Sequence, residues 1–217
     1  MEAGATWMKK QNVYPYRKKK TASSPIKEIS KVLDMQDYLK EKSERDYILF
    51  VIGISTGYRA GDLVALQIRD IRMALEDGQF VILENKKKNC KNIRKSNMKP
   101  RRAPIIDNVD AALRKYIKDK KDYDYMFPSR KGEHNHIDVP RVTVILKEAA
   151  SHFGLKKITA HSMRKTYAYQ LWVSSGYNTT LVKDMLGHES EHETRRYLGL
   201  DDDMYRECSK SLNKLVR

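Results

Sequence analysis

Hydrophobic residues recur along most of this 217-residue chain at the spacing of three and four that marks amphipathic helices. One segment differs: residues 45–55 are apolar on nearly every side, which predicts a helix buried at the centre of the fold. Thr56-Gly57 ends that helix, and Asp62 opens another that carries Leu63, Val64, Leu66 and Ile68. The remaining periodic segments predict helices over 31–42, 110–120, 140–153, 161–172, 179–186, 191–198 and 203–216.

Two β-rich runs interrupt the helical pattern. Gln79 to Glu84 follows the turn signal Asp77-Gly78, and residues 103–106 form the returning strand of a hairpin. The tip between them, residues 86–102, is dense in lysine and arginine and is suited to phosphate contacts. The fold class expected is α+β, mainly helical, with one small antiparallel sheet packed on a helical core.

The charge balance indicates the class of partner. Lysine and arginine number 43 against 28 acidic residues, which gives a net charge of +15 and a pI near 9.6. Such a surface favours a polyanion, although a structural nucleic-acid binder has the same charge, so the activity stays open at this point. Residues 1–25 read as a flexible basic arm or linker, and residues 26–217 as one domain. No long apolar run predicts a membrane span, and Cys90 and Cys208 lack the spacing of a disulfide or metal framework.

Five residues bear the candidate chemistry. Arg59 follows the break at Gly57, and His161 and Arg164 are three apart, so they share one helix face. His188 follows Leu186-Gly187, and Tyr197 comes nine residues later between arginines and a leucine. Each has a plain structural alternative: a surface arginine, a histidine at a helix end, or one of 13 tyrosines. Together they are the groups that attack a phosphodiester without a metal.

The order of three motifs resembles the tyrosine recombinase (phage integrase) family. Residues 56–66 (TGYRAGDLVAL) are similar to its first arginine box, and residues 161–168 (HSMRKTYA) to its HxLRHTFA box. Residues 186–197 match LGHxxxxxTxxY with the spacing intact. The resemblance covers residues 25 to 215 and implies the catalytic-domain fold for 26–217. It also implies a site-specific recombinase or integrase that cleaves and rejoins DNA through a 3′-phosphotyrosyl intermediate, with no cofactor and no metal.

The resemblance assigns a role to each residue. Arg59 and Arg164 bind the phosphate, because a guanidinium stays charged and matches phosphate with two parallel donors. Tyr197 is the nucleophile. His161 and His188 hydrogen-bond the scissile phosphate, and His161 is also a candidate acceptor of the tyrosine proton.

A lysine after the second strand of the family's hairpin protonates the leaving oxygen, and here it falls in a run of three. Lys86 is the assignment, with Lys87 and Lys88 adjacent and the hairpin longer and more basic than usual. Where the family's second box has a histidine after its arginine, this chain has Lys165. The expected DNA contacts are Lys87, Lys88, Lys91, Arg94, Lys95, Lys165, Arg195 and Arg196.

Other hypotheses explain less of the pattern. A non-catalytic DNA-binding module fits the helix-turn-helix spacing of 179–198 but leaves the five-residue set as an accident. Tyr205 is a rival nucleophile that the spacing from His188 disfavours, and a type IB topoisomerase shares the chemistry but not the motif wording. His134, His136 and His152, or His188 with His192, could suggest a metal, but neither cysteine nor HExxH accompanies them.

The partners and location implied are double-stranded DNA, a homotetramer assembled on it, no membrane, and the cytoplasm, at the nucleoid or phage DNA. The family's N-terminal DNA-clamping domain has no counterpart in residues 1–25, as expected of a fragment or of a naturally short catalytic-domain protein.

Overall fold

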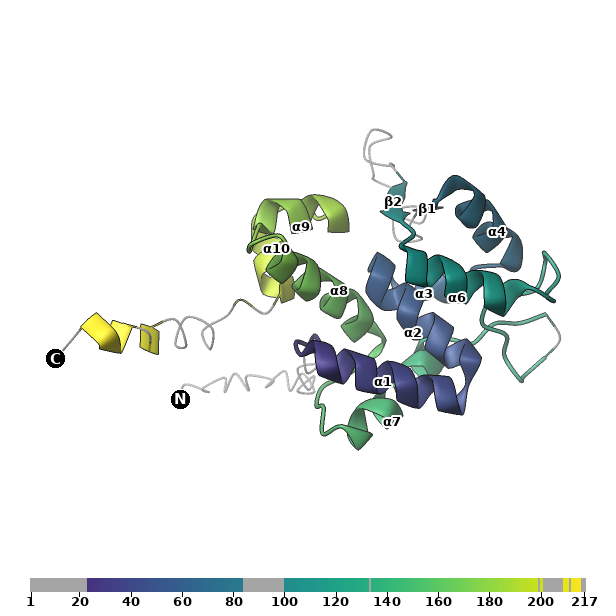
Figure 1. The fold of residues 1–217 in the computed structure, drawn as a ribbon, viewed down its shortest axis with the longest axis horizontal. Coiled ribbons are helices and arrows are strands. Elements are labelled where there is room, and N and C mark those ends of the chain that lie inside the picture. Colours follow the sequence, from purple (N-terminus) through teal and green to yellow (C-terminus); the bar gives the residue numbers. More distant parts are fainter. Residues whose placement is uncertain are drawn as a thin grey trace, which may run out of the picture.

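The computed structural model describes residues 23–83, 100–132, 134–198, 200, 209–210 and 212–215. Within these residues, no helix combines the length and the hydrophobicity needed to cross a membrane. The elements follow in the order shown in Figure 1: α1 (Ile29–Lys42), α2 (Glu44–Thr56), α3 (Ala60–Val64), α4 (Ile68–Asp77), β1 (Gln79–Ile82), β2 (Arg101–Pro104), α6 (Asp107–Ile117), α7 (Val139–His152), α8 (Ala160–Ser174), α9 (Thr179–Leu186), α10 (Glu191–Leu198) and η2 (Leu212–Leu215).

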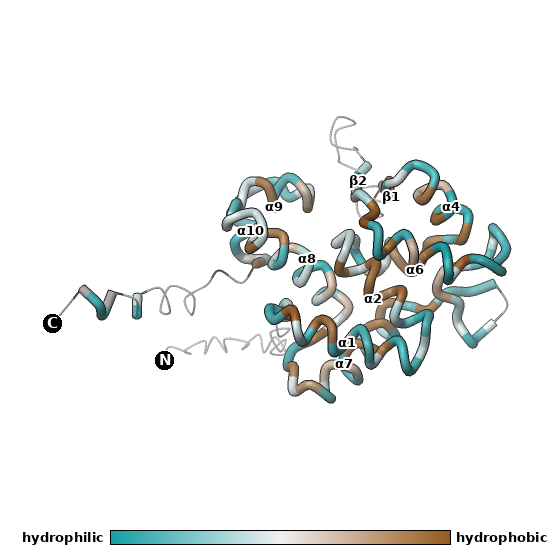
Figure 2. Tube along the Cα trace, in the orientation of Figure 1, coloured by the Kyte–Doolittle hydropathy of each residue, from teal (hydrophilic) through white to brown (hydrophobic). Residues whose placement is uncertain are grey.

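Helix α2 is the centre of the fold, as its apolar sequence predicts. Ile48, Leu49 and Ile52 are at most 1% exposed, and α1, α6 and α8 all contact the helix. Figure 2 shows the hydrophobic colouring of α2 among more polar outer helices. The expectation of a mainly helical α+β fold is therefore confirmed.

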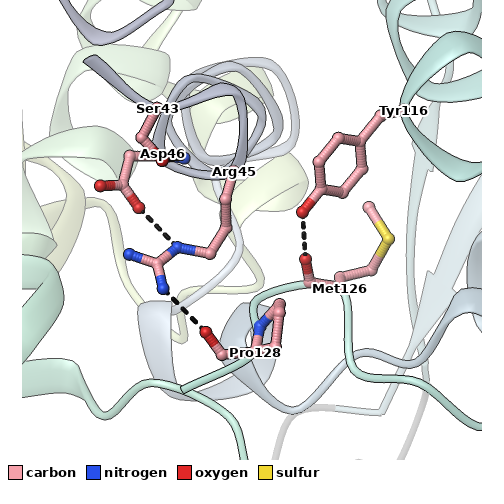
Figure 3. A network of polar contacts seen from close by, with 6 residues as sticks. All are labelled: Ser43, Arg45, Asp46, Tyr116, Met126 and Pro128. Carbon is pink, nitrogen blue, oxygen red and sulfur yellow. Dashed lines mark hydrogen bonds and ion pairs between the residues drawn. The ribbon is translucent and has the colours of Figure 1, made fainter. Parts of the chain in front are cut away.

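The start of α2 is tied to the loop before α7. Arg45 pairs with Asp46 at 2.8 Å and donates from Nη1 to the Pro128 carbonyl at 2.7 Å. Nearby, the buried Tyr116 hydroxyl donates to the Met126 carbonyl at 2.8 Å (Figure 3). These bonds hold residues 126–128 against the helical core and fix one end of the central helix.

The prediction of one helix running through Leu66 and Ile68 is wrong, because the structure has two short helices there, α3 and α4. Between them the backbone runs extended beside residues 124–126. The Ile68 N–H donates to the Asp124 carbonyl and the Met126 N–H to the Leu66 carbonyl, both at 2.9 Å. These bonds to a distant loop replace helical ones, so the apolar spacing continues while the helix does not.

The two strands form an antiparallel hairpin with Phe80 opposite Ala103 and Ile82 opposite Arg101. The returning strand thus begins and ends two residues earlier than predicted. Its residues alternate, so Arg101 and Ala103 are buried while Arg102 is exposed. The predicted cationic tip lies mainly in 84–99, outside the described residues.

Helices α8, α9 and α10 enclose a second hydrophobic cluster built on Trp172, Val182, Leu186 and Leu198. The predicted bounds of α9 and α10 are confirmed. The side chain of Asn178 accepts from the Leu181 N–H at 2.9 Å and so begins α9. Of the predicted tail helix 203–216, the described part includes the short 3₁₀ helix η2.

Residues Ser23 to Lys27 lie along α8 before the chain enters α1. The Ile26 N–H donates to Thr166 Oγ1 at 2.9 Å, and Gln170 Nε2 donates to the Lys27 carbonyl at 2.8 Å. The Ile26 side chain is 1% exposed. This segment is therefore part of the packed structure. The division between an arm, 1–25, and a domain, 26–217, stays a prediction.

Candidate active site

The turn between α2 and α3, residues 56–59, positions Arg59. Gly57 has φ +60°, a left-handed conformation that ends α2. The Tyr58 side chain is 1% exposed, and its hydroxyl lies 2.7 Å from the Arg101 carbonyl and 3.2 Å from that of Phe80. The turn is thus fastened to both strands of the hairpin. Arg59, half-buried, follows at the N-terminus of α3.

Replacing Gly57 by alanine is expected to destabilise the protein strongly. A Cβ there would lie 2.3 Å from Tyr167 Cδ1, and the positive φ adds backbone strain. We expect a loss of about 2–5 kcal/mol in the free energy of unfolding, measured with urea. Gly78→Ala is the matched control, because Gly78 has φ +66° but nothing within 4 Å. Equal losses in both variants would show that the contact with Tyr167 is immaterial.

Arg164 on α8 connects the turn to the segment bearing His188. Its side chain is 1% exposed. Nη1 donates to the Gly57 carbonyl at 2.9 Å, and Nη2 donates to the Leu186 carbonyl at 2.8 Å. Because the guanidinium bridges two backbone carbonyls from distant parts of the chain, its position is fixed before any ligand arrives.

The two histidines flank Tyr197. The rings of His161 and His188 each lie 5.1 Å from the tyrosine ring, edge-on, at 82° and 70°. His188 Nδ1 is 2.9 Å from Thr194 Oγ1, which orients the imidazole ring beside the tyrosine. The structure therefore brings the predicted residues of three separate motifs into one cluster.

Tyr197 is held in its neutral form. Its hydroxyl oxygen is buried and makes no hydrogen bond of good geometry with the described residues. Burial raises the pKa of Tyr197 well above its usual range, while the positive charges of Arg164 and Arg59, the former close to the hydroxyl, act in the opposite direction.

His161 is held neutral by the opposite shift. Desolvation by the atoms packed around the ring lowers its pKa to about 4, and the charges of Arg164 and Lys165 lower it further, followed by Arg59 and His188. One side of the residue remains exposed to solvent. At neutral pH the imidazole is therefore unprotonated and able to accept a proton.

This shift makes stability depend on pH. In the unfolded chain His161 binds its proton with a pKa of 6.5, and in the folded protein with a pKa of about 4. Between these values the unfolded state binds more protons, so the free energy of unfolding falls as the pH drops from 6.5 towards 4. His161→Gln should weaken this fall, measured by urea unfolding across that range. His192→Gln, at an exposed position on α10, is the control. Identical pH profiles for wild type and His161→Gln would contradict the prediction.

The predicted DNA-contacting residues are only partly described. Lys165 Nζ lies 5.5 Å from the centre of the Tyr197 ring and donates to the Ser23 carbonyl at 2.8 Å. Arg195 on α10 is exposed. Outside the described side chains lie Lys86, Lys87, Lys88, Lys91, Arg94, Lys95 and Arg196, whose roles stay predictions.

Two of the other histidines have structural partners. His152 Nε2 is 2.9 Å from the Tyr38 hydroxyl, and His136 Nδ1 is 2.7 Å from the Ile137 carbonyl. Over the ranges that the structure describes, no three histidine, cysteine or acidic side chains gather closely enough to hold a metal ion.

Two buried charged residues beside the turn were not predicted as functional. Asp62, 6% exposed, follows Arg59 by three residues, a helical spacing that could have indicated it. Arg101 is 9% exposed, and in the sequence it is one of many basic residues of the hairpin. Nothing in that basic run distinguishes it until the strand is known to begin there.

Known proteins share this arrangement of elements and motifs. A model of the phage integrase family matches residues 25–204. The chain is 30% identical over 188 residues to the probable integrase/recombinase YoeC of Bacillus subtilis (strain 168), covering 86% of this chain and 94% of that protein. It is 28% identical over 167 residues to the tyrosine recombinase XerC of Caldanaerobacter subterraneus subsp. tengcongensis, covering 76% of this chain and 44% of that protein.

The XerH site-specific recombinase, solved in a post-cleavage complex with palindromic difH substrate, has a similar fold. The TM-score is 0.59 at 21% identity, covering 86% of this chain and 52% of that one. The chain thus spans nearly all of YoeC but about half the length of XerC and XerH.

Proposed function

This chain belongs to the phage integrase family and is a site-specific tyrosine recombinase that acts on DNA, and we propose that its nucleophile is Tyr197. The observation that carries the proposal is the buried Tyr197 hydroxyl, flanked by two histidine rings, with the positive charges of Arg164 and Arg59 acting on it. A phenol beside cationic side chains is suited to attack a bound phosphodiester, because the cations attract the phosphate and favour the ionised phenol.

In the proposed reaction, Tyr197 Oη forms a bond to the scissile phosphorus as the bond to the 5′ oxygen of the next nucleotide breaks. The phenol loses its proton and the departing 5′ oxygen gains one. Because one phosphate ester bond replaces another and no water attacks the phosphorus, the bond energy is kept for rejoining. Attack by a 5′ hydroxyl on the 3′-phosphotyrosyl bond reverses these steps and rejoins the strands. Arg59 and Arg164 stabilise the charge that develops on the phosphate oxygens.

His161 is the proposed acceptor of the phenol proton. Without DNA, desolvation and then the cations around it lower its pKa to about 4, which makes it a weak base. A bound phosphodiester brings a negative charge that offsets those cations and raises the pKa of the imidazole. The base therefore gains strength when the substrate is present. The leaving-group acid is proposed to be Lys86, with Lys87 and Lys88 as the neighbouring candidates.

The DNA surface and the assembly follow from the same proposal. The net charge of +15 supplies the electrostatic attraction to the duplex, and the exposed Arg195 lies two residues from the nucleophile. A tetramer on DNA is the assembly that the resemblance implies. Its formation can be measured by sedimentation with and without DNA. The proposed location of this recombination is the cytoplasm, at the nucleoid or on phage DNA.

Covalent trapping tests the function. The probe is a set of short duplexes tiled across the DNA flanking the gene, each with a nick just 3′ of a candidate cleavage position, so that a released fragment cannot be rejoined. We expect a denaturant-resistant protein–DNA adduct on the duplex that carries the recombination site, with a phosphotyrosine mapped by mass spectrometry to Tyr197. Binding to that site without any adduct would favour the non-catalytic DNA-binding module instead.

A further inference from the structure

Arg101 makes several contacts with the turn that bears Arg59. From β2, its Nη1 donates to the Gly57 carbonyl at 3.1 Å, and its Nη2 donates to the Thr56 carbonyl. The guanidinium carbon lies 4.3 Å from the centre of the Tyr58 ring. The Arg101 side chain thus contacts three consecutive residues, Thr56, Gly57 and Tyr58.

The contact is reciprocal. The Tyr58 hydroxyl lies 2.7 Å from the Arg101 carbonyl and donates to it, so side chain and backbone of the two residues hold each other. The Gly57 carbonyl also accepts from Arg164 Nη1 at 2.9 Å. Two guanidiniums from different elements therefore converge on a single carbonyl oxygen. Bringing two like charges together in a buried site is costly, which argues for a role beyond folding.

We propose that Arg101 is a positioning residue for strand cleavage: it locks the Arg59 turn to the β1–β2 hairpin so that Arg59 and Arg164 keep one geometry towards a bound phosphate. This inference rests on the proposed function. The turn carries Arg59, and its Gly57 carbonyl also accepts from Arg164 Nη1. Holding the turn in place therefore fixes the positions of both proposed phosphate ligands. The charge of Arg101 also favours the ionised form of Tyr197.

The neighbouring residue provides a matched control. Arg102 has the same side chain one position along β2, but it lies on the opposite, exposed face of the strand. Arg101→Ala and Arg102→Ala therefore remove equal charge from the same strand. Only the first removes the bonds to the turn. Arg101→Lys keeps the charge and the long stem but lacks the fork that reaches two carbonyls at once.

The experiment measures single-turnover adduct formation on the nicked duplex that the wild type cleaves, at saturating DNA, together with DNA affinity and urea unfolding. We expect Arg101→Ala to slow adduct formation by roughly 10–100-fold relative to Arg102→Ala, with similar DNA affinity in both. Added ethylguanidinium should recover part of the rate of Arg101→Ala and leave Arg102→Ala unchanged. Arg101→Lys should lie between Arg101→Ala and the wild type.

Two outcomes overturn the inference. One is an equal rate for Arg101→Ala and Arg102→Ala. The other is a slow rate of adduct formation in Arg101→Ala that parallels a loss of DNA affinity or stability and is not recovered by ethylguanidinium. That result would show that Arg101 has a structural role only. If Arg101→Ala does not fold, a wild-type rate for Arg101→Lys overturns it equally. Absence of any adduct with both the wild type and Arg102→Ala refutes the proposed function instead, which separates the two failures.

Discussion

Tyr197→Phe is expected to eliminate the covalent DNA adduct. The substitution removes one oxygen atom and keeps the aromatic ring, so the edge-on contacts with His161 and His188 remain. The phenol has no substitute in phenylalanine, so the adduct should fall below detection rather than decrease by a factor. The lost hydroxyl is buried without a hydrogen bond of good geometry to the described residues, so stability should stay within about 1 kcal/mol of wild type.

The measurement is adduct formation on the nicked duplex, with thermal unfolding and DNA affinity as checks that the fold is intact. Tyr205→Phe is the control for the rival nucleophile and should retain the full rate. Tyr177→Phe, at a tyrosine 62% exposed between α8 and α9, controls for the loss of a phenol elsewhere. An adduct that persists in Tyr197→Phe and disappears in Tyr205→Phe would transfer the nucleophile to Tyr205.

Arg164→Ala is expected to reduce both catalysis and stability, because this guanidinium is structural as well as a proposed phosphate ligand. Its removal leaves the carbonyls of Gly57 and Leu186 without these donors inside the protein. That should lower the free energy of unfolding by about 2–5 kcal/mol. Loss of phosphate stabilisation should slow adduct formation by roughly 10²–10³-fold or more.

A second substitution separates the two effects. Arg164→Lys retains a positive charge but cannot reach both carbonyls, so we expect stability to fall nearly as far as in Arg164→Ala while catalysis falls less. Urea unfolding gives the first quantity and single-turnover adduct formation at saturating DNA gives the second. If Arg164→Ala folds and forms the adduct within tenfold of the wild-type rate, Arg164 is a structural residue alone.

The sequence predicts elements well where local chemistry alone determines them. Helix α9 has the predicted bounds because Asn178 begins it and Gly187, at φ +66°, ends it, and both signals are local. The prediction of a helix through residues 66–68 is wrong for the contrary reason. Their helix is replaced by backbone bonds to residues 124–126, which lie more than fifty positions away and leave no trace in the local pattern.

In the site, too, the sequence predicts some properties and misses those that depend on distant contacts. The motif order indicates which residues gather, but not that Arg164 is buried on two carbonyls or that His161 has a pKa of about 4. Both properties depend on what folding places around the side chain. Arg101 illustrates the limit most clearly. A buried arginine breaks the rule that charged residues lie outside, so the basic run gives no sign that Arg101 is buried.

The segment from Ser23 to Lys27 bears on how the protein can be joined to anything else. Because Lys165 Nζ, Thr166 Oγ1 and Gln170 Nε2 bond to its backbone, a tag or domain attached ahead of Ser23 is anchored mechanically to α8. That helix also bears His161 and Arg164. Cutting the chain at Lys27 would remove these anchors and uncover the pocket of Ile26, so a truncated protein should begin no later than Ser23. A load applied there would pull on the helix that carries His161 and Arg164.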